Sequence, residues 1–168
     1  MSSYNHSPAQ LVALEKDYCL ATWHEIFILI WRHETTLDGL RALDHALRDH
    51  ERTYPGGCGL LTIIEQGAPM PSSDVRTAMA RFMTEAARII KSSAVTFEGA
   101  GFRAAAVRGV VTGLTMLARQ PYPHKVFATV DEAARWLSGS LKATAQVAID
   151  SSALLGALGA LRERVKKG

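Results

Sequence analysis

Residues 124–137 limit the fold of this chain more than any other stretch, because they have the pattern of a short buried strand followed at once by a capped helix. Val126 and Phe127 are residue types that favour strands. Thr129 is suited to cap the following helix, and Glu132 stands three residues later, where its side chain can complete a capping box. The stretch predicts an α/β protein in which this helix packs on a sheet.

Two apolar, strand-favouring runs lie in the amino-terminal part of the chain, at residues 17–23 and 26–32, separated by His24 and Glu25. This spacing predicts an antiparallel hairpin. From Ile26 to Trp31 every residue is apolar, which indicates a strand covered on both faces. The same reasoning predicts a buried strand at residues 58–65 and a short one at residues 94–97.

Apolar residues recur at helical spacing between these strands. The clearest helix covers residues 75–90 and begins after a cap at Ser72 or Ser73. Residues 102–118 form another helix, which is apolar around most of its circumference. The predicted order is β-β-α-β-α-β-α-β-α. The fold class is α/β: a mixed sheet, with an N-terminal hairpin and then mainly parallel strands, covered by helices.

The last part of the chain is predicted as an appendage: residues 1–141 form the α/β domain, and residues 142–168 form a connector and a C-terminal amphipathic helix. The face of helix 102–118 and the apolar stripe of the C-terminal helix are candidate protein interfaces. Their residues are Phe102, Ala105, Ala106, Gly109 and Gly113 on the first, and Leu154, Leu158 and Leu161 on the second. The C-terminal helix has two alternative explanations: it is an ordinary helix that closes the domain, or it forms a homodimer contact.

Charge and hydropathy narrow the class of protein. The 19 basic and 16 acidic residues give a net charge of +3, a modest excess typical of a solubility feature. The basic residues of the central helices are dispersed, so we expect no nucleic-acid partner. No uncharged apolar run approaches the roughly 18 residues of a membrane span, which predicts a cytoplasmic protein without a transmembrane segment. The cations that end the C-terminal helix suggest peripheral membrane contact as a further hypothesis.

Residues capable of catalysis or metal binding are sparse. Cys19 and Cys58 are the only cysteines, and both lie in predicted strands, where they resemble small buried hydrophobes. His45 and Asp49 lie one turn apart, a spacing better explained by a surface pair on a helix. We therefore expect no catalytic residues, no metal site and no cofactor. An enzyme would require His45 or His24 in a cleft, with a second polar group in hydrogen-bond reach.

The order of elements, and the segment 126–137 in particular, resembles the closing strand and helix of STAS domains, the SpoIIAA-like group related to anti-sigma-factor antagonists. The resemblance covers roughly residues 12–141 and implies a non-enzymatic regulatory module. In some relatives a serine at the start of the helix after the third strand is phosphorylated, which here corresponds to Ser72 and Ser73. The segment reads Pro-Ser-Ser-Asp where those proteins carry an Asp-Ser-Ser-Gly-like signature. Simple N-capping is the alternative role for both serines.

Two functions follow as hypotheses. The first is a regulatory or scaffolding module that acts through contact with a protein partner or through self-association. The alternative is a carrier or sensor of a small apolar ligand, held in a pocket between helix and sheet and lined by soft side chains. The residues proposed to line it are Met70, Met79, Phe82, Met83 and Met116. This alternative predicts a cavity beside Met79 and Met83, and the competing explanation is that these residues are ordinary core.

Overall fold

The computed structural model describes residues 7–99, 105, 109 and 120–167. The helix predicted at residues 102–118 lies outside them, apart from Ala105 and Gly109. The strands are β1 (Gln10–Leu14), β2 (Tyr18–Trp23), β3 (Ile26–Trp31), β4 (Cys58–Ile64), β5 (Ile90–Phe97) and β6 (His124–Phe127). The helices are α1 (Leu37–Thr53), α2 (Ser73–Glu85), the short 3₁₀ helix η2 (Ala86–Arg88), α4 (Val130–Ala145) and α5 (Ser151–Lys166).

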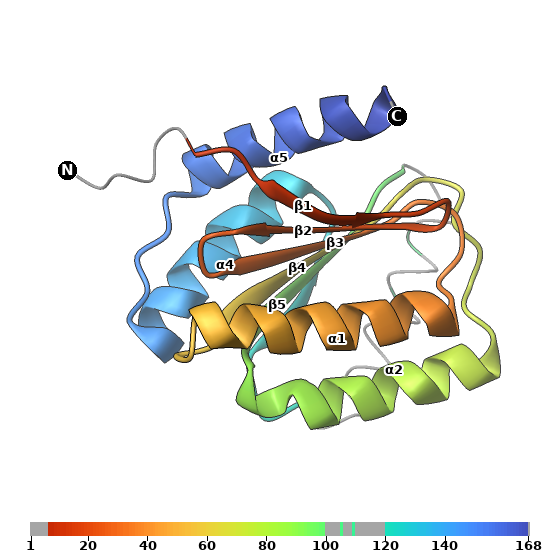
Figure 1. Ribbon diagram of the computed structural model, residues 1–168, viewed down its shortest axis with the longest axis horizontal. Coiled ribbons are helices and arrows are strands. Elements are labelled where there is room, and N and C mark those ends of the chain that lie inside the picture. Colours follow the sequence, from red (N-terminus) through yellow and green to blue (C-terminus); the bar gives the residue numbers. More distant parts are fainter. Residues whose placement is uncertain (1–6, 100–104, 106–108, 110–119, 168) are drawn as a thin grey trace.

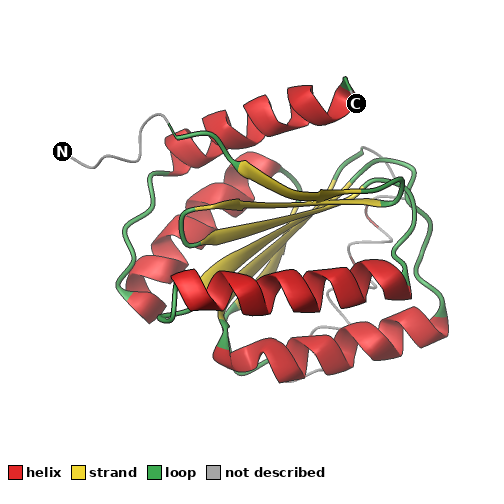
Figure 2. Cartoon of the chain, viewed as in Figure 1, coloured by secondary structure: helices red, strands yellow, loops and turns green. Residues whose placement is uncertain are grey.

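The described strands form one mixed sheet in the order β1-β2-β3-β4-β5-β6. β1, β2 and β3 are antiparallel neighbours, and β3 to β6 run parallel to one another. Helices α1 and α2 cover one face, and α4 and α5 cover the other, so the molecule has three layers (Figures 1 and 2). The predicted fold class, with its hairpin and later parallel strands, is confirmed.

Strand β3 lies at the centre of the packing. Its residues are all buried, as its continuous apolar sequence predicts. Ile26, Ile28 and Ile30 face the α4/α5 side, whereas Phe27 and Leu29 face the α1/α2 side. Because successive side chains of a strand point to opposite faces, this one strand contributes to two separate apolar cores.

Helix α4 begins as the sequence predicts. Thr129 accepts a hydrogen bond from the Glu132 backbone N–H at 3.2 Å, and the Glu132 carboxylate accepts one from the Thr129 N–H at 3.3 Å, which completes the capping box. The helix continues to Ala145, past the predicted end at residue 141, and stops at Gln146, whose φ of 57° is left-handed. Residues predicted as a connector therefore belong to α4.

Strand β1 was missing from the predicted order. It is an edge strand with largely exposed residues, and a bulge between Leu11 and Ala13 interrupts its pairing with β2. A short strand of this kind carries no alternating apolar pattern, because neither of its faces is fully covered.

The predicted helix at residues 75–90 was too long. Helix α2 ends at Glu85, and Ile90 already pairs with Cys58 as the first residue of β5. Ile89 and Ile90 continue the helical spacing of apolar residues, but their buried side chains belong to the turn and the strand. Spacing alone does not separate these two states where apolar residues are adjacent.

Candidate functional site

A cavity of about 90 Å³ lies between α2 and the sheet, on the α1/α2 face. Its sheet side is formed by β3, β4, β5 and β6, and its opposite side by α1, α2 and the loop that precedes α2. The apolar lining residues are Leu29, Trp31, Leu40, Leu43, Leu60, Ile64, Ala68, Pro69, Met70, Pro71, Met79, Phe82, Met83, Val95 and Phe97. We call this cavity the apolar pocket.

Four of the five residues predicted to line a ligand pocket do line it: Met70, Met79, Phe82 and Met83. Met116 lies outside the described residues. Met70 is partly exposed at 40%, whereas Phe82 is buried. Methionine side chains are flexible and polarisable, so this lining can adapt to ligands of different shapes.

Two polar side chains lie side by side in the sheet wall of this pocket. Ser93 of β5 and His124 of β6 are direct partners in the parallel register, and both line the pocket. Ser93 is 1% exposed, and its Oγ is buried with no hydrogen-bond partner among the described residues. Both ring nitrogens of His124 are buried and similarly unpartnered within the described part of the chain.

The protonation state of His124 follows from its surroundings. Burial lowers the pKa of the imidazole from its ordinary value of 6.5 to about 4, because a charged ring is poorly solvated there. His124 is therefore neutral at pH 7, with one ring nitrogen as donor and the other as acceptor. Among the described residues, the lining carries no carboxylate, ammonium or guanidinium group.

The end of α2 at the pocket is held by the segment that precedes β6. The Tyr122 hydroxyl donates to the Met83 carbonyl oxygen at 3.2 Å, and the Gln120 amide donates to the Met83 sulfur at 3.4 Å. Tyr122 is buried. These contacts join the pocket's helical side to the strand that carries His124.

A second cavity, of about 290 Å³, lies beside the β2–β3 turn and is lined by residues that include His24, His50 and Tyr54. The Ser7 Oγ and the His24 Nε2 are 2.6 Å apart, and Trp23 Nε1 donates to the Ser7 carbonyl at 2.9 Å. The geometry that the enzyme hypothesis requires is thus present at His24. Since Ser7 makes both contacts, they also attach the segment before β1 to the hairpin turn.

His50 is buried at 7% exposure against the rings of Phe27 and Tyr54, with centroid distances of 5.8 and 4.8 Å. Burial lowers the pKa of His50 to about 4. His45 is exposed on α1, with its Nε2 3.5 Å from an Asp49 carboxylate oxygen. The interpretation of this pair as a surface pair on a helix agrees with that exposure.

The two serines predicted as phosphorylation sites lie at the start of α2. Ser72 is the N-cap, and its Oγ accepts from the Val75 N–H at 3.4 Å. Ser73 is the first helical residue, and both serines are exposed. Capping is therefore observed for Ser72, and phosphorylation of either serine stays a prediction.

The interface predicted on the C-terminal helix needs correction. Leu154, Leu158 and Leu161 are buried in the same core as α4 and the sheet, so they are not available to a partner. The stripe closes the domain, which was the alternative explanation. On the other predicted interface, Ala105 and Gly109 are exposed in a helix, and Phe102, Ala106 and Gly113 lie outside the described residues.

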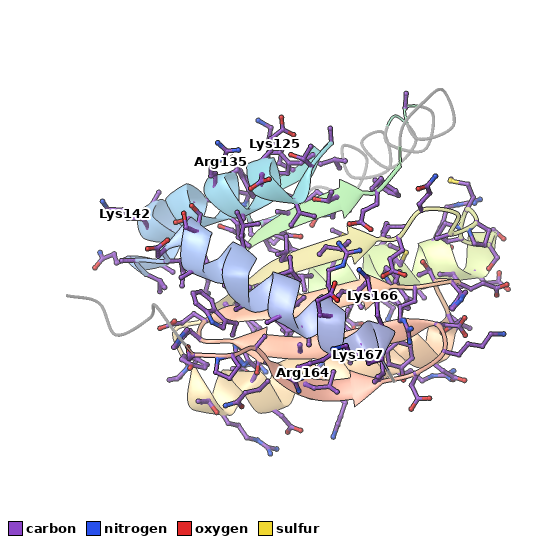
Figure 3. All side chains as sticks on the ribbon, turned by 90° about the horizontal axis from the view of Figure 1, so that it is seen from above. Lys125, Arg135, Lys142, Arg164, Lys166 and Lys167 are labelled. Carbon is purple, nitrogen blue, oxygen red and sulfur yellow. The ribbon has the colours of Figure 1, made fainter. Side chains whose placement is uncertain are left out.

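The cations at the end of α5 are largely engaged by the chain itself. Arg162 donates to both carboxylate oxygens of Glu98, Arg164 donates to the Ala9 carbonyl at 3.1 Å, and Lys166 pairs with Glu163 at 3.0 Å. Figure 3 shows Arg164, Lys166 and Lys167 together at this end, apart from Arg135 and Lys142 on α4. Peripheral membrane contact through α5 stays a prediction.

The cysteines are free and buried, and burial raises the pKa of the Cys19 thiol to about 11 and that of Cys58 to about 12. Across the described ranges, no three or more His, Cys, Asp or Glu side chains come together as metal ligands. None of the helices in those ranges has the length and apolar character that crossing a bilayer requires.

Comparison with solved structures identifies the architecture. An uncharacterized protein of the DUF3478 family from Shewanella loihica PV-4, described as having a SpoIIAA-like fold, superimposes with a TM-score of 0.51. The chain has a SpoIIAA-like fold. The match covers 82% of this chain and 98% of the Shewanella protein at 11% sequence identity, so the likeness concerns the fold alone. No protein-family model and no curated protein matches the sequence.

The SpoIIAA-like fold confirms the predicted architecture and leaves the pocket residues to be explained from their own geometry. Ser93 and His124 were not among the predicted site residues. The sequence pattern gave little signal for Ser93, because the predicted strand began at residue 94 and the residues that precede Ser93 are Lys91 and Ser92. Its pairing with His124 depends on the sheet register, which the sequence does not specify.

Proposed function

We propose that this protein is a non-enzymatic binding module that holds a small, largely apolar molecule in the apolar pocket. The observation that supports this proposal is the lining: methionine, phenylalanine and aliphatic side chains surround a cavity between helix and sheet, without a charged group among the described lining residues. Ligand sites are concave and mainly apolar, with a few polar groups that orient the ligand.

The size of the pocket sets the size of the ligand group. An apolar cavity of roughly 150 Å³ admits benzene, and larger pockets of at least about 300 Å³ are typical for drug-sized molecules. At about 90 Å³, the apolar pocket suits one aromatic ring or a short alkyl group, once the methionine side chains adjust. The remainder of a longer ligand would extend out of the pocket past the partly exposed Met70.

Toluene is a suitable first probe, and methyl NMR of protein labelled at the methionine methyl groups reports on its location. We expect saturable shifts of the Met79 and Met83 methyl signals. A pocket-filling variant, Val95→Phe, should abolish these shifts. Val147→Phe is the matched control, because Val147 packs on the opposite face of the sheet. Absence of saturable shifts, or equal shifts in Val95→Phe, would contradict the proposal.

The SpoIIAA-like fold favours a second function, a regulatory or scaffolding module that acts through protein contact or self-association. Ala105 and Gly109 are small and exposed, which leaves room for a partner at these two residues. Sedimentation velocity should then give a mass above that of one chain, and Ala105→Arg should return it to the monomer. A monomer at all concentrations would contradict self-association.

Intact-mass measurement of protein from its host tests phosphorylation at Ser72 or Ser73, since each phosphate adds about 80 Da.

A further inference from the structure

We propose that Ser93 and His124 together recognise an uncharged hydroxyl group on the ligand of the apolar pocket. This inference rests on the proposed function and specifies the chemical class of the ligand: a small apolar body that carries an alcoholic or phenolic hydroxyl at its inner end. The observation behind it is the juxtaposition of two unpartnered polar side chains in the wall of one apolar pocket.

Leaving these groups unpartnered is costly. A buried donor or acceptor without a partner costs roughly 1–3 kcal/mol, and native proteins satisfy the great majority of such groups. Here the Ser93 hydroxyl and both His124 nitrogens are unpartnered among the described residues, on adjacent strands at the same register position. Their coincidence in one place is what a site built to receive a polar group requires.

The neighbouring serine shows that this sheet satisfies buried hydroxyls elsewhere. Ser92 is also fully buried, but it faces α4, where its Oγ lies 2.7 Å from the Ser140 Oγ and 3.2 Å from the Thr144 Oγ1. Consecutive strand residues thus place one hydroxyl in a satisfied network and the other in the pocket. Of these two adjacent hydroxyls, that of Ser93 on the pocket face is the one without a partner among the described residues.

The chemistry of the pair selects the ligand group. A neutral imidazole offers one donor and one acceptor, and a serine hydroxyl offers both. A ligand hydroxyl can donate to one of these groups and accept from the other. A carboxylate or phosphate would enter without a counter-charge, since the described lining residues include no lysine or arginine. The pair therefore favours a neutral hydroxyl.

Phenol and toluene test this inference, because they have nearly the same shape and differ by a hydroxyl in place of a methyl group. A purely apolar cavity favours toluene, since the hydroxyl of phenol loses its water there. We expect the wild-type protein to bind phenol at least as tightly as toluene. In Ser93→Ala and in His124→Phe, the ratio of phenol affinity to toluene affinity should fall about tenfold, the equivalent of one hydrogen bond. The ratio is the readout because a change in pocket shape affects both probes alike, whereas the lost hydrogen bond affects phenol alone.

Ser92→Ala is the matched control, and its ratio should equal that of the wild type because Ser92 faces α4. If His124→Phe does not fold, Ser93→Ala alone decides. A tenfold toluene preference in the wild-type protein, or an unchanged ratio in the pocket variants, would overturn the inference and leave the proposed function standing. Failure of both probes to bind would overturn the proposed function itself.

Discussion

The two faces of the sheet treat buried polar groups differently. On the α4/α5 face, Ser92 lies within hydrogen-bond distance of Ser140 and Thr144, and the Ser138 hydroxyl donates to the Ile149 carbonyl. On the α1/α2 face, Ser93 and His124 have no partner among the described residues, and they line a cavity. The two faces therefore differ in whether these buried polar groups have partners, and the proposed ligand site lies on the face where they do not.

Glycine allows a helix to approach the sheet closely on both faces. At Gly59 of β4, an added Cβ would lie 2.7 Å from the Leu141 Cδ1 of α4. The absence of a side chain lets α4 approach the sheet closely there. Gly39 of α1 does the same on the other face, where an added Cβ would lie 2.6 Å from the Trp31 ring. On the α1/α2 face, flexible methionines of α2 oppose the sheet across the apolar pocket.

The largest expected contrast between the faces lies in truncations of their apolar side chains. Leu137 of α4 is 0% exposed, and Leu137→Ala should cost about 3 kcal/mol in unfolding free energy, from lost burial and the cavity created. Met79 is only partly buried beside an existing cavity, so Met79→Ala should cost less than about 1.5 kcal/mol. Urea unfolding measures both values, and equal losses would break the comparison.

The α1/α2 side should also be the acid-sensitive one. His50 and His124 have pKa values of about 4 in the folded protein against an ordinary 6.5. Above pH 6.5 both are neutral whether or not the chain is folded. As the pH falls from 6.5 to 4, the unfolded chain binds protons first, so stability is lost, on the order of 2–3 kcal/mol for each histidine.

Unfolding free energies at pH 7, 6 and 5 test this expectation. His124→Phe and His50→Phe should each flatten the pH dependence relative to the wild type. Val147→Ala is the control, because it shortens a side chain on the opposite face and removes no titratable group. If neither phenylalanine variant reduces the slope, the two buried histidines are not the cause of the acid sensitivity.

The helix caps offer a smaller contrast. Thr129 takes part in the reciprocal capping box of α4, whereas Ser72 caps α2 through a single 3.4 Å hydrogen bond. Thr129→Ala should therefore cost about 1–2 kcal/mol and Ser72→Ala about 0.5 kcal/mol. Thermal or urea unfolding distinguishes them, and a larger loss for Ser72→Ala would reverse the ranking of the two faces.

The smallest effect belongs to the adjacent serines. Ser92→Ala removes a satisfied hydroxyl and should cost about 1 kcal/mol, whereas Ser93→Ala removes an unpartnered one and should be neutral or stabilising by a few tenths of a kcal/mol. The unfolding free energies of the two variants in urea compare the hydroxyls on the two faces directly. A loss in Ser93→Ala as large as that in Ser92→Ala would show that Ser93 has a partner.

Much of the fold was predictable because its signals are local. The capping box at Thr129 and Glu132 involves residues three apart, and the buried character of β3 is visible in its continuous apolar run. Strand β1 was not predictable from a pattern, since its edge position leaves it half exposed. The start of β5 was misplaced because Ile89 and Ile90 suit a helix and a strand equally by spacing.

The candidate site was predictable in its helical part and at Met70 of the preceding loop. Met79, Phe82 and Met83 share one face of a helix, and that face can be read from their spacing. Whether it packs fully or leaves a cavity depends on the side chains opposite, which come from distant strands. The apolar stripe of α5 raised the same question, and there the face packs fully: Leu154, Leu158 and Leu161 are buried in the core.

The sequence by itself determined the types of the elements, the caps of α4 and α2 and the apolar character of each buried strand, because these depend on neighbours within about four residues. Only the tertiary structure decided that Ser93 lies beside His124, that both face an apolar pocket, and that the α5 stripe is covered. Those outcomes depend on sheet register and layer packing, which bring together side chains far apart in the chain.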